Sequence, residues 1–213
     1  MKPTERHRGR PKKGDEHDTD HLMEAALVSF AEHGFDKTPL RLIAARAGVD
    51  VALISYRFGS KFGLWRAVVS SVHDASILQL EEFLLQAETL PINQQLDFIS
   101  AKLVDLIFQR PAFAKVLLTE FISNISEERK ELISETLMRP MHETIMSYLR
   151  KANIIVDKAD QPDPGLSLTV AIASVALVSS TATLALIFTE FGDDRQRLRE
   201  DLAKLFCRIL KQQ

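Results

Sequence analysis

Residues 38–64 read TPLRLIAARAGVDVALISYRFGSKFGL, and this stretch decides the fold of the front of the chain. Two short apolar-patterned segments lie on either side of Gly48, and Asp50 stands where a helix cap is expected. Two short helices joined by a tight glycine turn make a helix-turn-helix, which presents its second helix to DNA. A purely structural helical hairpin has the same spacing, so both interpretations stay open on spacing alone.

The second short helix is predicted to have two different faces. Its inner face would pack on the first helix through Ile54 and Phe58, which meet Ile43, Ala44 and Val49. Its outer face carries small, hydroxyl or basic side chains that can approach base edges and phosphates closely. These outer residues are Val51, Ala52, Ser55, Tyr56 and Arg57.

Helical spacing extends over nearly all the rest of the chain. An apolar stripe begins after Asp18 or Thr19 and ends at Gly34, and no segment alternates with the period of a strand. We therefore expect an all-α chain of about nine helices. Beyond the two short helices, the pattern predicts helices over 61–88, 92–109, 111–124, 127–152 with a kink at Pro140, 165–189 and about 193–211.

Charge is distributed unevenly along the 213 residues, although the net charge is only −2. Residues 1–14 and residues 37–66 each carry six lysines and arginines against one acidic side chain. The remainder of the chain is strongly acidic. Two basic segments on an acidic chain predict a polyanionic partner at one end of the molecule.

The stretch at 38–64 closely resembles the signature of the TetR family of transcriptional regulators, which has an N-terminal helix-turn-helix. The preceding LMEAALVSFAEHGFDKT is similar to the family's first helix, so the resemblance covers about residues 19–68. Beyond that region the chain is similar to the family in length and helical layout alone. The positions in register with the signature are Thr38, Ile43, Ala44, Ala47, Gly48, Val49, Ile54, Tyr56, Phe58, Ser60, Lys61 and Leu64.

This resemblance implies which residues meet DNA. Val51, Ala52 and Ser55 would face the major groove, while Tyr56 and Lys61 would contact the phosphate backbone. Thr38 would cap a helix and touch a phosphate at its N-terminus. Arg41 and Arg57 complete the set of candidate DNA contacts. For Arg41 the alternative, that it lies on a solvated surface and touches no DNA, stays open.

Three positions depart from the family pattern. Asp50 replaces the usual serine at the helix cap, and its charge would repel a phosphate rather than bind one. Ser55 stands where a second aromatic residue is common, and Arg57 where histidine is common. The departures leave the DNA-binding interpretation intact and make the target sequence unpredictable.

Residues 1–15 are expected to form a flexible basic arm. Its Arg8-Gly9-Arg10-Pro11 resembles the core of an AT-hook, which lies in the minor groove of A·T-rich DNA. Arg8 and Arg10 are therefore candidate DNA contacts, with a merely charged tail as the alternative. Behind the arm we expect a DNA-binding domain over 16–76 and an effector-binding and dimerisation domain over 77–213.

The back half is expected to bind a ligand and a second copy of the chain. The resemblance implies a four-helix homodimer interface over about 165–211, in which Leu198, Leu202, Leu205, Phe206 and Ile209 form a stripe. It also implies an apolar effector cavity lined by the middle helices. Candidate lining residues are Phe98, Phe108, Phe113, Phe121 and Leu177, each of which can equally be core.

Several classes of function are not expected. His17 and His21 are spaced for a metal on one helix face, but no third ligand is evident, and no catalytic residue or cofactor motif stands out. The uncharged stretch 165–189 is rich in hydroxyl side chains, so we expect no membrane span. The single cysteine and the polar N-terminus favour a cytoplasmic protein.

The sequence thus predicts a homodimeric, sequence-specific DNA-binding regulator. We expect a repressor that binds a palindromic operator and is released by a small apolar effector of unknown identity. The alternative is an effector-independent architectural DNA-binding protein that uses the AT-hook-like arm. Operator, regulated genes and the sign of regulation do not follow from the sequence.

Overall fold

The computed structural model describes residues 15–122, 126–156, 159–180 and 194–211, with side chains given from residue 19 and not for 121–122. Every regular element within these ranges is helical, which confirms the all-α prediction. In chain order the elements are α1 Asp15–His33, α2 Leu40–Ala47, α3 Val51–Phe58, α4 Lys61–Glu88, α5 Ile92–Phe108, α6 Pro111–Ile122, α7 Glu127–Ile133, the π-helical stretch η1 Ser134–Met138, α8 Arg139–Lys151, α9 Pro164–Ser180 and α11 Arg195–Lys211.

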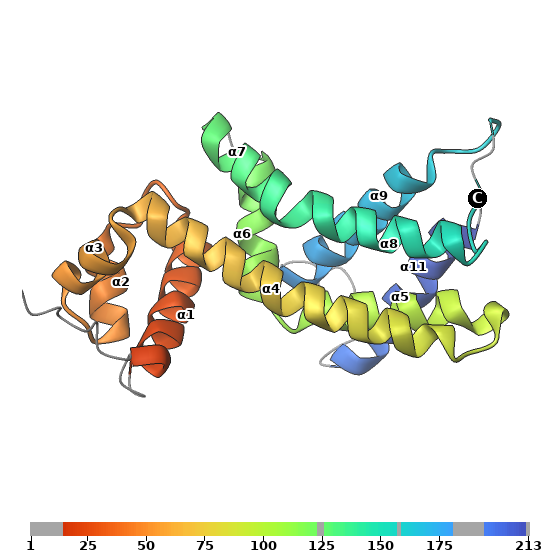
Figure 1. The fold of residues 1–213 in the computed structure, drawn as a ribbon, viewed down its shortest axis with the longest axis horizontal. Coiled ribbons are helices and arrows are strands. Elements are labelled where there is room, and N and C mark those ends of the chain that lie inside the picture. Colours follow the sequence, from red (N-terminus) through yellow and green to blue (C-terminus); the bar gives the residue numbers. More distant parts are fainter. Residues whose placement is uncertain (1–14, 123–125, 157–158, 181–193, 212–213) are drawn as a thin grey trace, which may run out of the picture.

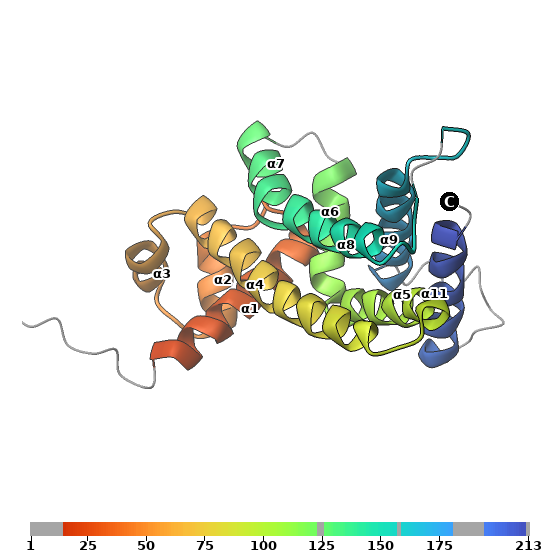
Figure 2. The same cartoon turned by 45° about the vertical axis from the view of Figure 1, so that its right-hand side comes forward.

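Helix α4 joins the two ends of the molecule. Figure 1 shows α1, α2 and α3 gathered around its first turns, while its remaining length runs beside α5 and α8, and Figure 2 agrees. Ser60 caps α4 as an oxygen acceptor for the Gly63 amide at 3.0 Å, and the helix spans the predicted range.

Two apolar cores share α4. The first holds the buried faces of α1, α2 and α3 around the fully buried Trp65, whose ring meets Phe30 edge-on with centroids 5.3 Å apart. The second begins at Leu80 and is built with α5, α8, α9 and α11. Side chains of α6 and α7, among them Phe113 and Ile133, also enter the first core. The domain limits 16–76 and 77–213 remain a proposal, because the front core includes side chains from the back half.

The segment 127–151 changes helical register before its proline. The Arg139 amide donates to Ser134 O, five residues back, and Pro140 follows with no amide hydrogen to donate. The single kinked helix predicted over 127–152 is therefore an α-helix, a π-helical stretch and a second α-helix. Met138, at the end of this stretch, faces the internal cavity described below.

Candidate nucleic-acid interface and ligand cavity

The turn between α2 and α3 has the geometry that the sequence predicts. Gly48 has φ +67°, a conformation that favours glycine, and its amide donates to Ala44 O and Ala45 O at the end of α2. Asp50 then caps α3, because its Oδ1 accepts from the Ala52 amide at 2.7 Å. Local backbone chemistry alone therefore sets the path from α2 into α3.

The inner face of the pair is anchored in the front core. Ile43, Ala44 and Ile54 are buried, and Val49 and Phe58 pack partly buried against the same cluster. This is the packing predicted from the apolar spacing. It fixes the rotation of α3 about its axis and hence the side chains that α3 turns outward.

The outer face of α3 is open to solvent. Val51 is 37% exposed, Tyr56 is 88% exposed, and Ala52 and Ser55 are exposed beside them. An aromatic ring so fully presented on a folded domain contributes little to the core, which favours a role in binding. The structure thus brings four of the predicted DNA-contacting residues onto one surface.

The basic residues around α3 have different surroundings. Arg41 is exposed on α2, and Lys37, which sequence analysis had not singled out as a contact, is exposed just before that helix. The Arg57 guanidinium donates to Thr19 Oγ1 on α1 and is half-buried. Arg8 and Arg10 lie outside the described residues.

Lys61 supports the turn that leads into α2. Its Nζ donates to Phe35 O at 2.9 Å and to Asp36 O at 3.2 Å, and it lies 4.6 Å from the centroid of the Phe35 ring. Two of its three donors are thus directed at protein carbonyls in this structure. Its predicted phosphate contact can use the remaining donor.

The expectation that Thr38 caps α2 is wrong. The helix begins one residue later than expected, so Pro39 occupies the cap position and no side chain caps this end. The Thr38 side chain is completely buried, and its hydroxyl lies 2.6 Å from Gly34 O and 3.2 Å from Ser29 O. The hydroxyl lies against carbonyl oxygens at the end of α1, so it does not face a phosphate.

A buried ion pair connects this front region to the back half. Arg129 of α7 donates to both carboxylate oxygens of Asp36, at 2.9 Å and 3.2 Å. Its Nε also lies 3.1 Å from Glu120 Oε2 of α6, an ion pair without hydrogen-bond alignment, and its guanidinium stacks 4.5 Å from the Phe35 centroid. The pKa of Glu120 is raised above its usual value, mainly because the carboxyl group is buried. The positive charge of Arg129 lowers this pKa and the negative charge of Asp36 raises it, both by smaller amounts.

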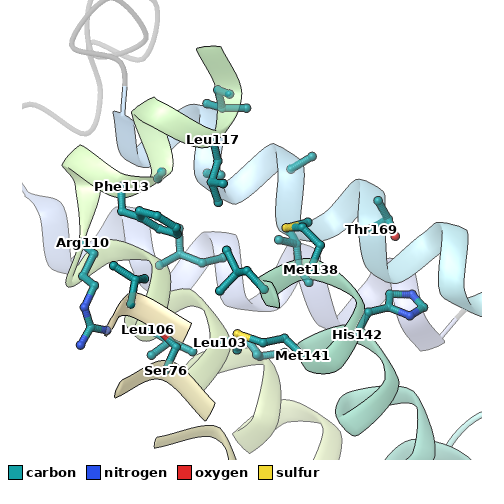
Figure 3. Close-up of a pocket in the computed structure, with 18 of the residues that line it drawn as sticks. Ser76, Leu103, Leu106, Arg110, Phe113, Leu117, Met138, Met141, His142 and Thr169 are labelled. Carbon is teal, nitrogen blue, oxygen red and sulfur yellow. The ribbon is translucent and has the colours of Figure 1, made fainter. Parts of the chain in front are cut away.

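An apolar cavity of about 340 Å³ lies in the back half. Side chains of α4, α5, α6, η1, α8 and α9 line it, and Figure 3 shows Arg110 and Phe113 toward one end and His142 and Thr169 toward the other. Most of the lining residues are aliphatic. The volume is at the lower end of the range for small-molecule sites.

Among the predicted cavity residues, Phe113 alone is placed at the cavity by the structure. Phe98 and Phe108 pack partly buried against the second core, because α5 turns Leu103 and Leu106 toward the cavity instead. Leu177 is 45% exposed on the outside of α9. These three residues therefore do not line this cavity, contrary to expectation, and the side chain of Phe121 lies outside the described ones.

Apolar side chains are exposed on the outer faces of the last two helices. Leu166 and Val170 of α9 and Leu205 of α11 are each about half exposed. Leu202 and Phe206, expected in the dimer stripe, are instead buried within the subunit, since α11 packs them against α5. The outward stripe is therefore narrower than predicted.

Residues 22–68, which hold this helix-turn-helix, match the family model described as "Bacterial regulatory proteins, tetR family". Over these residues the chain is similar to the TetR family of bacterial regulatory proteins. The match agrees with the helical arrangement, in which an N-terminal helix-turn-helix precedes a C-terminal helical domain.

Two relatives of this chain carry regulator names. It is 33% identical over 131 residues to the HTH-type transcriptional dual regulator CecR of Shigella flexneri, covering 60% of this chain and 57% of the relative. It is 31% identical over 138 residues to the probable HTH-type transcriptional regulator YttP of Bacillus subtilis, covering 64% and 59%. The chain thus spans less than two thirds of the length of both relatives.

Solved structures share this fold over at least nine tenths of the chain. The fatty acid degradation regulator FadR from Bacillus halodurans matches with a TM-score of 0.67 at 17% identity, over 95% of this chain and all of that one. A transcriptional regulator from Rhodococcus sp. Rha1 matches with a TM-score of 0.65 at 17% identity, over 90% and 95%. At these identities the likeness shows the fold. Within the described ranges, no helix is both long and apolar enough to cross a bilayer.

Proposed function

We propose that the chain is a sequence-specific DNA-binding transcriptional regulator that represses transcription until a small molecule enters its cavity. The observation that carries the proposal is the open face of α3, where the 88% exposed Tyr56 stands beside Val51, Ala52 and Ser55 on a rigidly held helix. Small side chains let a helix backbone enter the major groove closely, and a tyrosine hydroxyl can reach a phosphate. Arg41, Arg57 and Lys61 supply positive charge around that face.

The proposed DNA-binding form is a homodimer. A palindromic site requires two recognition helices separated by about one turn of B-DNA, roughly 34–36 Å, or a multiple of it. The exposed apolar side chains of α9 and α11 offer the self-complementary surface that a two-fold interface needs. We place that interface within residues 165–211.

The proposed control operates through α4. This helix begins at Lys61 beside the α1–α2 turn, and further along it contributes Val72 and Ser76 to the cavity wall. A ligand that favours one tilt of α4 would change the separation of the two α3 helices in a dimer. Release of DNA then requires the ligand to bind the non-DNA-binding arrangement more tightly.

The test is selection of DNA fragments from a random library by the purified protein, followed by fluorescence anisotropy with the recovered sequence. We expect a two-fold symmetric consensus and an affinity for it about a thousandfold or more above that for scrambled DNA. A reporter gene placed behind this sequence should be expressed less when the protein is present. Equal affinity for scrambled DNA would refute sequence-specific regulation and favour an architectural role.

A further inference from the structure

We propose that the cavity binds an alkyl carboxylate, with the chain in the apolar interior and the carboxylate on Arg110. The inference rests on the proposed function in taking this cavity as the effector site, and it adds the chemical class of the effector. Arg110 stands between α5 and α6, where its backbone oxygen accepts from the Ala114 amide and its side chain reaches the cavity (Figure 3).

The cavity wall selects an alkyl body. Most of its lining residues are leucine, isoleucine, valine, methionine or alanine, and Phe113 is the one phenylalanine, tyrosine or tryptophan among those described. The other lining residues are Ser76, Arg110, His142 and Thr169. A wall with so few aromatic rings offers little stacking for a flat aromatic ligand. Met138 and Met141 add flexible side chains that adapt to chains of different length.

Polar groups near the His142 end already have partners. His142 Nε2 lies 3.1 Å from Gly165 O, and the Thr169 hydroxyl donates to the same oxygen at 2.8 Å. These contacts hold α8 against the first turn of α9. Since these contacts use His142 Nε2 and the Thr169 hydroxyl within the protein, we expect that end to hold the terminal methyl of a ligand and not its head group.

The opposite end holds a buried guanidinium nitrogen, Arg110 Nη1, without a hydrogen-bond partner among the described residues. The described lining also contains no aspartate or glutamate that could neutralise the guanidinium. A buried donor without a partner costs free energy, and more so when it is charged, so a ligand that supplies an acceptor gains from filling it. A carboxylate fits best, because the guanidinium fork binds its two oxygens at once.

The experiment compares three probes that share one alkyl chain: decanoate, decanol and decylamine. Isothermal titration calorimetry and thermal shift are measured with the purified full-length protein below the micelle concentration of each probe. We expect decanoate to bind at least about tenfold more tightly than decanol, since hydrogen bonds to a charged group contribute on that scale, and decylamine to bind most weakly.

Variants assign the head group to one residue. Arg110→Gln should reduce decanoate affinity about tenfold or more while leaving decanol affinity unchanged. Arg110→Glu should reverse the preference and favour decylamine. Lys115→Gln removes a positive charge from the exposed side of α6 and should leave all three affinities unchanged.

The outcomes separate this inference from the proposed function. Equal binding of decanoate and decanol, an Arg110→Gln variant that keeps the decanoate preference, or no binding of any probe would each overturn the alkyl carboxylate assignment. If decanoate binds through Arg110 but leaves DNA affinity unchanged, the ligand assignment stands and ligand-controlled DNA binding fails.

Discussion

At the residue scale, the proposed DNA-binding surface of α3 combines residues expected to read bases with a tyrosine expected to contact the phosphate backbone. Ala52 and Ser55 are exposed on the same helix face as Tyr56, whose ring has little contact with its own subunit. Because the side chain is so exposed, removal of its hydroxyl should leave folding unaffected. DNA binding can therefore be tested here without a change in stability.

We expect Tyr56→Phe to weaken binding to the selected operator and to random DNA by the same factor, because a phosphate contact carries no sequence information. Substitution of Ser55 by Ala or Asn should instead change which sequence is preferred. Footprinting and competition anisotropy measure both effects, and unaltered melting temperatures serve as the control. Identical base preferences for the Ser55 variants would contradict its placement in the groove.

Asp50 is a second residue at which an effect on stability can be separated from an effect on DNA binding. Its carboxylate accepts from the Ala52 amide, so Asp50→Ala should lower the free energy of unfolding by about 0.5–2 kcal/mol. Asp50→Ser keeps a capping oxygen and should be close to neutral in stability. It also removes a negative charge beside the phosphates, so it should tighten DNA binding. Urea denaturation and anisotropy distinguish the two effects.

At the element scale, the α1–α2 turn and helices α6 and α7 are joined by the buried pair of Arg129 and Glu120. Arg129 also reaches Asp36 and the Phe35 ring, and Lys61 lies against the same ring. The turn that positions α2 is thus held by one cation from α4 and one from α7. The π-helical stretch η1, which follows α7, contributes to the cavity wall. A movement of α6 or α7 would therefore displace the side chains that hold the α1–α2 turn.

Arg129→Met should destabilise the protein by about 3–5 kcal/mol, because it leaves the Glu120 carboxylate buried without its partner. The double variant Arg129→Met/Glu120→Met should recover much of that loss, since it removes both charges together. Chemical denaturation of the two variants measures the difference. Equal destabilisation of single and double variants would show that the loss comes from packing and not from the unpaired charge.

The raised pKa of Glu120 has a consequence for stability against pH. A carboxyl group that holds its proton more tightly in the folded state favours folding at low pH, and this contribution is lost as pH rises from 4.5 through the raised pKa. Glu120→Gln should therefore lose less stability than the wild type as pH increases across that window. Unfolding free energies measured from pH 4 to 8 test this, with the exposed Glu81→Gln as the matched control.

At the scale of the whole molecule, α4 joins the helix-turn-helix at one end to the helices around the cavity (Figure 1). We expect saturating ligand to weaken DNA binding without dissociating the dimer, because a tilt of α4 changes the separation of the α3 helices while α9 and α11 stay paired. Analytical ultracentrifugation with and without decanoate tests this. Monomers that appear as DNA is released would place the switch in the interface instead. Val170→Glu, on the exposed face of α9, provides the monomeric reference.

The helix-turn-helix could be predicted from sequence because its determinants are local. Gly48 and Asp50 act on backbone groups within a few residues, and the apolar spacing of α2 and α3 defines which sides face inward. The same spacing predicted the limits of α4 correctly, because a long helix depends mainly on periodicity and its cap. The predicted cap of α2 was Thr38, whereas the cap position lies one residue later, at Pro39. Helix ends are commonly uncertain by one or two residues.

The tertiary structure alone decided which side chains of the back half face the cavity. Phe98, Phe108 and Phe113 are chemically alike, and only the rotation of α5 and α6 in the packed bundle separates core from cavity wall. The signal for Arg110 was present as one basic residue in the segment FQRPAF, but its place in the cavity wall depends on how the helices pack. The pairing of Arg129 with Asp36 joins residues 93 positions apart, and no local pattern can encode such a contact. Local hydrogen bonds and helical periodicity depend on residues close together in the sequence, so they can be predicted from it. Contacts between distant helices form only when the whole chain has packed.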